Sequence, residues 1–178
     1  MTKQKKKLVL VNPLNTSTKG LVIHRQVIYP PLGLGIIATL TPDDWEVELI
    51  DENFDSFEYR EADLVGITAL TSSVTRAYEI ATIYEEKGIP TILGGIHASM
   101  MPEEAKKIVS TIVVGEVESV WKTLLEDFTK GKMKRQYTGQ ILPMEEMVRP
   151  KHEIFHKDYK FASVQTSRGC PMNCEFCS

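Results

Sequence analysis

Residues 64–95, LVGITALTSSVTRAYEIATIYEEKGIPTILGG, decide the fold. The stretch opens with an apolar run, 64–68, of the kind that forms a strand buried on both faces. A helix follows, because apolar residues recur at i, i+3, i+4 and i+7, at Ala77, Ile80, Ala81 and Tyr84. Gly88 ends this helix, and a second apolar run, 89–93, completes a β–α–β unit with a right-handed crossover.

The same alternation continues on both sides of this unit. Further strands are predicted over 8–11, 47–50 and 111–114, and further helices over 31–40, 102–109 and 117–128. Five strands alternating with helices indicate an α/β fold. We expect residues 1–130 to form a doubly wound, flavodoxin-like or Rossmann-like domain with a five-stranded parallel sheet.

The pattern changes after this domain. Residues 131–161 have poor periodicity, a basic start and prolines at 143 and 150, and they are predicted to be an extended linker that leaves the domain. Residues 161–166 are predicted to form one more strand. Residues 162–178 therefore look like the start of a second domain, cut short at its first strand.

Composition and charge argue against several classes of protein. Lys and Arg number 21 against 24 Asp and Glu, so the formal net charge of −3 gives no reason to expect nucleic-acid binding. No apolar run approaches the roughly 18 residues of a membrane-spanning helix. The basic start is followed by too short an apolar run for a secretory signal.

Small, hydroxyl-bearing and acidic residues follow three of the predicted strands. Ligands of an open parallel sheet bind beyond the carboxyl ends of its strands, near the topological switch point. Glycines let the backbone approach a ligand closely, and hydroxyls can both donate and accept hydrogen bonds. We therefore expect a wide cleft for a large, flat, amide-rich ligand, with these candidate residues: Thr68, Leu70, Thr71, Ser72, Gly94, Gly95, His97, Gly115, Glu116 and Glu118.

Several of these candidates also have a plainer interpretation. Gly94-Gly95 could be a simple turn, and Ser72 or Ser73 could be a helix cap. His97 could be a structural loop histidine, and Glu116 and Glu118 could be carboxylates that favour the dipole of the following helix. Their joint placement at one edge of one sheet favours ligand binding over these alternatives.

All three cysteines fall in one short stretch, TSRGCPMNCEFC over residues 166–177, and the rest of the chain has none. Three thiolates at the spacing C-x3-C-x2-C can hold three irons of a 4Fe–4S cluster and leave the fourth iron open. The metal-ligand candidates are Cys170, Cys174 and Cys177. Zinc, with His152 or His156 as a fourth ligand, and free surface thiols are the alternatives. Clustered thiols without a disulfide framework suggest a reducing cytoplasm.

This cysteine stretch resembles the signature of the radical S-adenosylmethionine superfamily, including the aromatic Phe176 before the third cysteine. The preceding residues resemble the cobalamin-binding domain found in one large subgroup, which includes the anaerobic magnesium-protoporphyrin IX monomethyl ester cyclases and radical methylases. The matching stretches are YPPLGL (29–34), DEN (51–53), GIT (66–68), GGIHA (94–98) and GEVE (115–118).

The chain departs from this family at two places. Many cobalamin-binding domains carry D-x-H-x-x-G after the first strand, and the histidine ligates cobalt. Here that loop reads NPLNTS over residues 12–17, and the neighbours of His24 do not fit the motif. Val117 stands where the family usually has glycine.

The resemblance implies three cofactors: cobalamin, a 4Fe–4S cluster and S-adenosylmethionine. It adds Leu32 and Gly33 to the residues expected to bind a cofactor. S-adenosylmethionine would chelate the open iron and be cleaved to a 5′-deoxyadenosyl radical, in a methyltransferase or oxidative cyclase.

The resemblance also implies a partner, a radical S-adenosylmethionine barrel of the same chain beyond Ser178. We therefore expect an N-terminal fragment that is inactive alone, with no catalytic residue of its own. The alternatives are a scaffold or substrate-binding module that no longer holds a corrinoid, or a zinc-binding protein.

Overall fold

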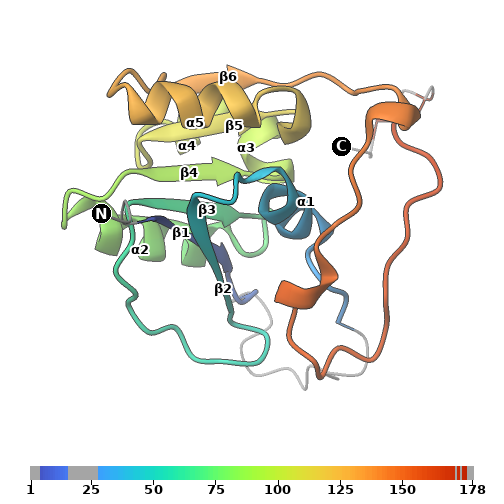
Figure 1. Cartoon of the computed structure of the whole chain (residues 1–178), viewed down its shortest axis with the longest axis horizontal. Coiled ribbons are helices and arrows are strands. Elements are labelled where there is room, and N and C mark those ends of the chain that lie inside the picture. The colour runs from blue at the N-terminus through green and yellow to red at the C-terminus, as the bar shows by residue number, and fades with distance from the viewer. Residues whose placement is uncertain (1–4, 16–27, 171, 173, 176–178) are drawn as a thin grey trace.

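Six parallel strands form one sheet at the centre of the molecule (Figure 1). The structure, a computed structural model, describes residues 5–15, 28–170, 172, 174 and 175. The strands are β1 Lys6–Asn12, β2 Trp45–Asp51, β3 Leu64–Thr68, β4 Thr91–Gly94, β5 Thr111–Val114 and β6 Gln136–Thr138. Their order is β2-β1-β3-β4-β5-β6, which is the flavodoxin-like order with one strand added at the edge.

The prediction of a doubly wound parallel sheet is confirmed, but the number of strands was wrong. The sixth strand, β6, lies within the predicted linker and pairs with β5 from Ile112 to Val114. Its three residues are too few to display an alternating pattern, and only Tyr137 among them is buried.

Helices cover both faces of the sheet. They are α1 Leu32–Leu40, α2 Val74–Glu85, α3 Ile96–Met100, α4 Pro102–Ala105 and α5 Trp121–Thr129, with short 3-10 turns η3 Val117–Ser119, η4 Met144–Glu146 and η5 His152–Ile154. The helix predicted over 102–109 is only one turn long. The helix predicted over 117–128 begins as η3 and continues as α5.

Two apolar cores result, one on each face. Side chains of α2, α3 and α4 pack on one face, where Ile80 and Tyr84 are fully buried. Helices α1 and α5 pack on the other, where Leu34, Trp121 and Leu124 are buried with Leu8 and Leu10 of β1. Alternate residues of each strand point to opposite faces, so one apolar strand supplies both cores.

The chain after the sheet returns across the molecule instead of leaving it. We call the described residues up to 130 the body and those from 131 on the C-terminal segment. After β6, this segment runs along the side toward which the arrow of β4 points (Figure 1). The backbone N–H of Lys151 donates to the carbonyl of Gly35 at 3.0 Å. The hydroxyl of Thr39 donates to the carbonyl of Arg149 at 2.7 Å. We call residues 149–159 the docked segment: 149–155 lie against α1, and 156–159 contact Phe54 and the end of β2.

The strand predicted over residues 161–166 is not formed. No neighbouring strand pairs with it, and an unpaired strand is not stable in water. Among the described residues, no helix is both long and apolar enough to cross a bilayer.

Candidate functional site

The carboxyl end of β3 borders the topological switch point, and those of β4 and β5 follow it along the same edge of the sheet. The strand order reverses between β1 and β3, because β2 lies on one side of β1 and every later strand lies on the other. Connections leave in opposite directions at such a point and open a crevice.

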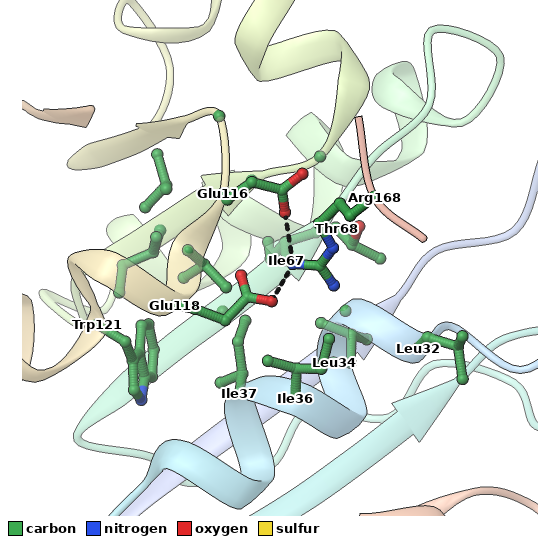
Figure 2. A pocket seen from close by; sticks show the side chains of 18 of the residues that line it. Leu32, Leu34, Ile36, Ile37, Ile67, Thr68, Glu116, Glu118, Trp121 and Arg168 are labelled. Carbon is green, nitrogen blue, oxygen red and sulfur yellow. Dashed lines mark hydrogen bonds and ion pairs between the residues drawn. The ribbon is translucent and has the colours of Figure 1, made fainter. Parts of the chain in front are cut away.

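A cavity of about 230 Å³ occupies this crevice on the face covered by α1 and α5 (Figure 2). Its apolar walls come from α1 and α5. Leu34, Ile36 and Ile37 project from α1 in Figure 2, and Trp121 lies at the start of α5. Most of the lining is apolar, so the cavity suits an apolar group with polar groups at its rim.

A glycine in the middle of β3 makes room for the cavity. The alternation along the strand places position 66 on the same face as Leu64, which belongs to the α1/α5 core. A Cβ at Gly66 would come within 3.0 Å of the Leu10 side chain. A glycine within an apolar strand marks such a close approach.

Gly95 shapes the rim of the cavity at the end of β4. Its φ is 94° and its ψ is −174°, a region that is open almost only to glycine. A Cβ there would lie 2.8 Å from the carbonyl oxygen of Ala69. The loops after β3 and β4 can therefore touch only if residue 95 is glycine.

Two carboxylates and one guanidinium form the polar side of the cavity. Glu116 and Glu118 follow β5, and Arg168 comes from the C-terminal segment (Figure 2). Arg168 Nη1 donates to Glu116 Oε2 at 3.0 Å and also to Glu118 Oε1. The side chains of Arg168 and Glu118 are only 9% and 4% exposed, so this ion pair is almost dry.

Eight of the twelve predicted cofactor-binding residues line this cavity, and their role in binding stays a prediction. They come from α1 and from the ends of β3, β4 and β5: Leu32, Gly33, Thr68, Gly94, Gly95, Gly115, Glu116 and Glu118. Sequence positions up to 86 residues apart are thus brought to one site by the parallel strands.

The other four, Leu70, Thr71, Ser72 and His97, do not line the cavity. Leu70 and Thr71 are exposed on the loop after β3. His97 is 3% exposed, with Nδ1 lying 3.3 Å from the Thr71 hydroxyl and Nε2 lying 3.3 Å from the Tyr78 hydroxyl. His97, in α3, thus contacts both the loop after β3, through Thr71, and α2, through Tyr78.

Tyr78 and Glu104 complete this side-chain group. The Tyr78 hydroxyl donates to Glu104 Oε1 at 3.1 Å. Burial, and then the hydrogen bond to Glu104, raises the pKa of Tyr78, so the phenol keeps its proton. The group lies on the α2 face, opposite the cavity.

Carboxylates at the end of β2 hold the loop after β1. Asp51 is 3% exposed and accepts from Asn12 Nδ2 at 2.9 Å and from the hydroxyl of Tyr159 at 2.5 Å. Burial, and then the hydrogen bond to Asp51, raises the pKa of Tyr159. Glu52 accepts from the backbone N–H of Leu14 at 3.0 Å. His24 and the rest of that loop lie outside the described residues.

The cysteines lie at the far end of the C-terminal segment. Cys170 is exposed, Cys174 is partly buried and both are free, while Cys177 lies outside the described residues. Among the described residues no group of three potential metal ligands is brought together. His156 stacks on Phe54 with 4.3 Å between ring centroids, so it is engaged by the body.

Several cavity residues were missed by the sequence analysis. The α1 side chains looked like ordinary core residues, because nothing in a helical stripe separates cavity wall from core. Two signals were available: Gly66 interrupts an apolar strand, and Arg168 is a charged residue directly before the cysteine motif.

The chain matches the B12 binding domain family over residues 18–125. It is 38% identical over 163 residues to a bacteriochlorophyllide d C-8(2)-methyltransferase of Chlorobaculum tepidum, a match covering 82% of this chain and 35% of that protein. It is 31% identical over 186 residues to the C-12(1)-methyltransferase of the same organism, covering 99% of this chain and 40% of that protein.

A hopanoid C-2 methylase of Rhodopseudomonas palustris is 30% identical over 159 residues, with 83% of this chain and 30% of that protein covered. The chain therefore spans well under half the length of these curated relatives. The family match favours cobalamin binding over the empty scaffold and the zinc protein.

Proposed function

The chain belongs to the B12-binding domain family, and from this premise we propose that it is the cobalamin-binding part of a radical S-adenosylmethionine methyltransferase. The observation that carries the proposal is the apolar cavity at the switch point, whose floor is Gly66 and whose rim is glycine-rich. Methyltransferase chemistry is preferred over an oxidative cyclase because the similar proteins are methyltransferases and a methylase by name.

The residues present fit such a cofactor. The cavity is far smaller than a whole cobalamin, so it would enclose one apolar part of it. The glycines at 94, 95 and 115 leave the strand ends open to a large ring. Leu32 and Gly33 would contact it from α1, and the loop residues Leu70, Thr71 and Ser72 would lie at its margin.

This chain's own residues would bind the cofactor and exclude water from it. The walls of α1 and α5 remove apolar surface from solvent. The loop after β1 has no D-x-H-x-x-G motif, and we propose that no histidine of that motif ligates cobalt here. When bound, the cobalamin would supply a methyl group or an electron for the reaction.

The cysteine motif would hold the second metal centre. Cys170, Cys174 and Cys177 would ligate three irons of a 4Fe–4S cluster, and S-adenosylmethionine would bind the open iron. The barrel that completes such a site would belong to the remainder of the full-length protein, and without it we expect no turnover. A cluster of this kind suits a reducing compartment, for which we propose the cytoplasm.

A corrinoid-retention experiment tests the proposal. The chain is mixed with hydroxocobalamin and gel-filtered, and the visible spectrum of the protein peak is recorded. The wild type is expected to keep corrinoid near one equivalent. Gly66→Val should weaken binding by about 5- to 150-fold, since filling a cavity costs about 1–3 kcal/mol.

Lys122→Ala is the matched control, because Lys122 is exposed on α5 and does not line the cavity. A wild-type chain that emerges without corrinoid absorbance would contradict the proposal. Equal corrinoid retention by the wild type and Gly66→Val would show that the cavity is not part of the binding site.

Anaerobic reconstitution tests the cysteine motif separately. Iron and sulfide bound with a brown chromophore, and lost in Cys174→Ser, are the expected result. Zinc bound without iron or sulfide would support the zinc alternative instead.

A further inference from the structure

Two negative charges lie in the wall of the cavity and require a cation. Glu118 is 4% exposed in its side chain and Glu116 is 36% exposed. A buried carboxylate costs several kcal/mol unless it is paired and hydrogen-bonded. A ligand whose polar groups are uncharged amides would not neutralise this pair.

Arg168 supplies the positive charge. Its Nη1 reaches both carboxylates, and its Nη2 donates to Gln165 Oε1 at 3.0 Å, which orients the guanidinium. Within the described part of the chain, no other cation pairs with Glu116 or Glu118. Arg168 therefore has to stay in the cavity wall whether or not the cavity is filled.

The position of Arg168 in the sequence means that this ion pair also affects where the cysteine motif lies. Arg168 precedes Cys170 by two residues, so the two Cα atoms lie within about 7 Å of each other. A guanidinium fixed in the cavity wall therefore fixes the start of the cysteine motif at the mouth of the same cavity.

Few other contacts hold the chain there. After Tyr159, the described residues make no backbone-to-backbone hydrogen bond. Phe161 contacts the ring of Tyr29, with 5.7 Å between centroids, and Val164 is 82% exposed. The segment from 160 to 170 is thus held between Tyr159 at the end of β2 and Arg168 at the loop after β5. Those two ends are four strand spacings apart, or about 19 Å.

We propose that Arg168 is a positioning residue, which holds the cysteine-bearing loop over the cofactor cavity through Glu116 and Glu118. The identity of the two cofactors brought together rests on the proposed function, whereas the docking itself does not. The spacing between the two metal centres would be set by this ion pair and not by the fold of the body alone.

A spin-label distance measurement on the cofactor-free chain tests this. One label is placed on Cys170, with Cys174 and Cys177 changed to Ser, and the second on α5 at Lys122→Cys. The wild-type loop is expected to give one narrow distance distribution. Arg168→Ala should broaden it to a spread on the order of 20 Å, as for a flexible chain of that length. Arg168→Lys should give an intermediate width.

Two further variants separate positioning from stability. Lys160→Ala removes a positive charge from the same exposed stretch without touching the carboxylates, and it should keep the narrow distribution. Arg168→Ala with Glu118→Gln removes the more deeply buried of the two unpaired charges, so its thermal midpoint should recover part of the way toward wild type while its distance distribution stays broad.

A narrow distribution in either Arg168→Ala variant overturns the proposal, as does equal broadening by Lys160→Ala. Because no corrinoid is present, a failure of cobalamin binding in the earlier test and a failure of docking here are separate results.

Discussion

The body and the C-terminal segment of this molecule are held together in different ways. The body is a sheet buried between two apolar cores, and its strands and helices follow from local sequence periodicity. The C-terminal segment pairs with the sheet only through the three residues of β6. Beyond β6 it is held by scattered contacts: the docked segment against α1, Tyr159 on Asp51, and Arg168 on Glu116 and Glu118. The difference shows that one site can have two kinds of wall. The wall from the body follows from the apolar pattern of the sequence, and the wall from the C-terminal segment depends on a few individual side chains.

The largest effect is expected from truncating an apolar side chain in the body. Ile80 is fully buried on α2, so Ile80→Ala should lower the free energy of unfolding by about 2–5 kcal/mol. Val164 of the C-terminal segment is 82% exposed, so Val164→Ala should change it by less than about 0.5 kcal/mol. Urea unfolding measures both, and equal losses would break the contrast between the two regions.

The second-largest effect is expected from removing a single hydroxyl group that anchors the C-terminal segment. Tyr159→Phe removes a hydrogen bond to the buried Asp51 carboxylate and should weaken docking by about 1.5–3 kcal/mol. The rate of tryptic cleavage at the exposed Lys157 and Lys160 should rise accordingly. Tyr29→Phe is the control, since the Tyr29 hydroxyl makes no such bond.

The pH dependence of docking follows from the same contact. The pKa of Tyr159 is raised in the folded chain, so its contribution is complete below the ordinary tyrosine pKa of about 10 and is lost as the pH rises above it. The ratio of the wild-type cleavage rate to that of Tyr159→Phe should therefore rise with pH in this range, because the titration of the lysines affects both proteins equally and only the wild type loses the hydrogen bond. An unchanged profile in Tyr159→Phe would assign the docking to other contacts.

The contrast also explains what the sequence could reveal. The strand 64–68 was predictable because burial on both faces requires a continuous apolar run. The helix face of Ala77 to Tyr84 was predictable because packing on one face of the sheet imposes a helical period. The C-terminal segment carries no period, since Tyr159 and Arg168 act as individual side chains on distant partners. The four candidates that do not line the cavity, including His97, follow strands at the same edge of the sheet as the eight that do, and sequence position alone does not separate the two groups.

A fourth prediction concerns Gly95 at the rim of the cavity. Gly95→Ala forces a Cβ into a backbone region open almost only to glycine, at a cost of about 1–3 kcal/mol. Gly94→Ala is the matched control, because nothing lies within 4 Å of a Cβ there. Urea unfolding should give a lower free energy of unfolding for Gly95→Ala than for Gly94→Ala. Equal values would mean that the loops after β3 and β4 can move apart without a loss of stability.

The smallest effect compares two glycines of α1 that face different surroundings. A Cβ at Gly33 meets nothing within 4 Å, whereas a Cβ at Gly35 would lie 2.6 Å from Phe155 and 3.0 Å from Pro150. Gly33→Ala should therefore stabilise the body by about 0.4–1 kcal/mol, because alanine has less conformational freedom to lose on folding.

Gly35→Ala gains the same entropy but displaces the docked segment, so its stability in urea should rise less and its cleavage at Lys157 should become faster. The two variants thus separate the body, where a methyl group on a helix is favourable, from the docked segment, whose contact with α1 needs a bare backbone at residue 35. If both variants leave cleavage unchanged, the docked segment is held by Tyr159 and the ring contacts around Phe54, and its packing against α1 contributes nothing measurable.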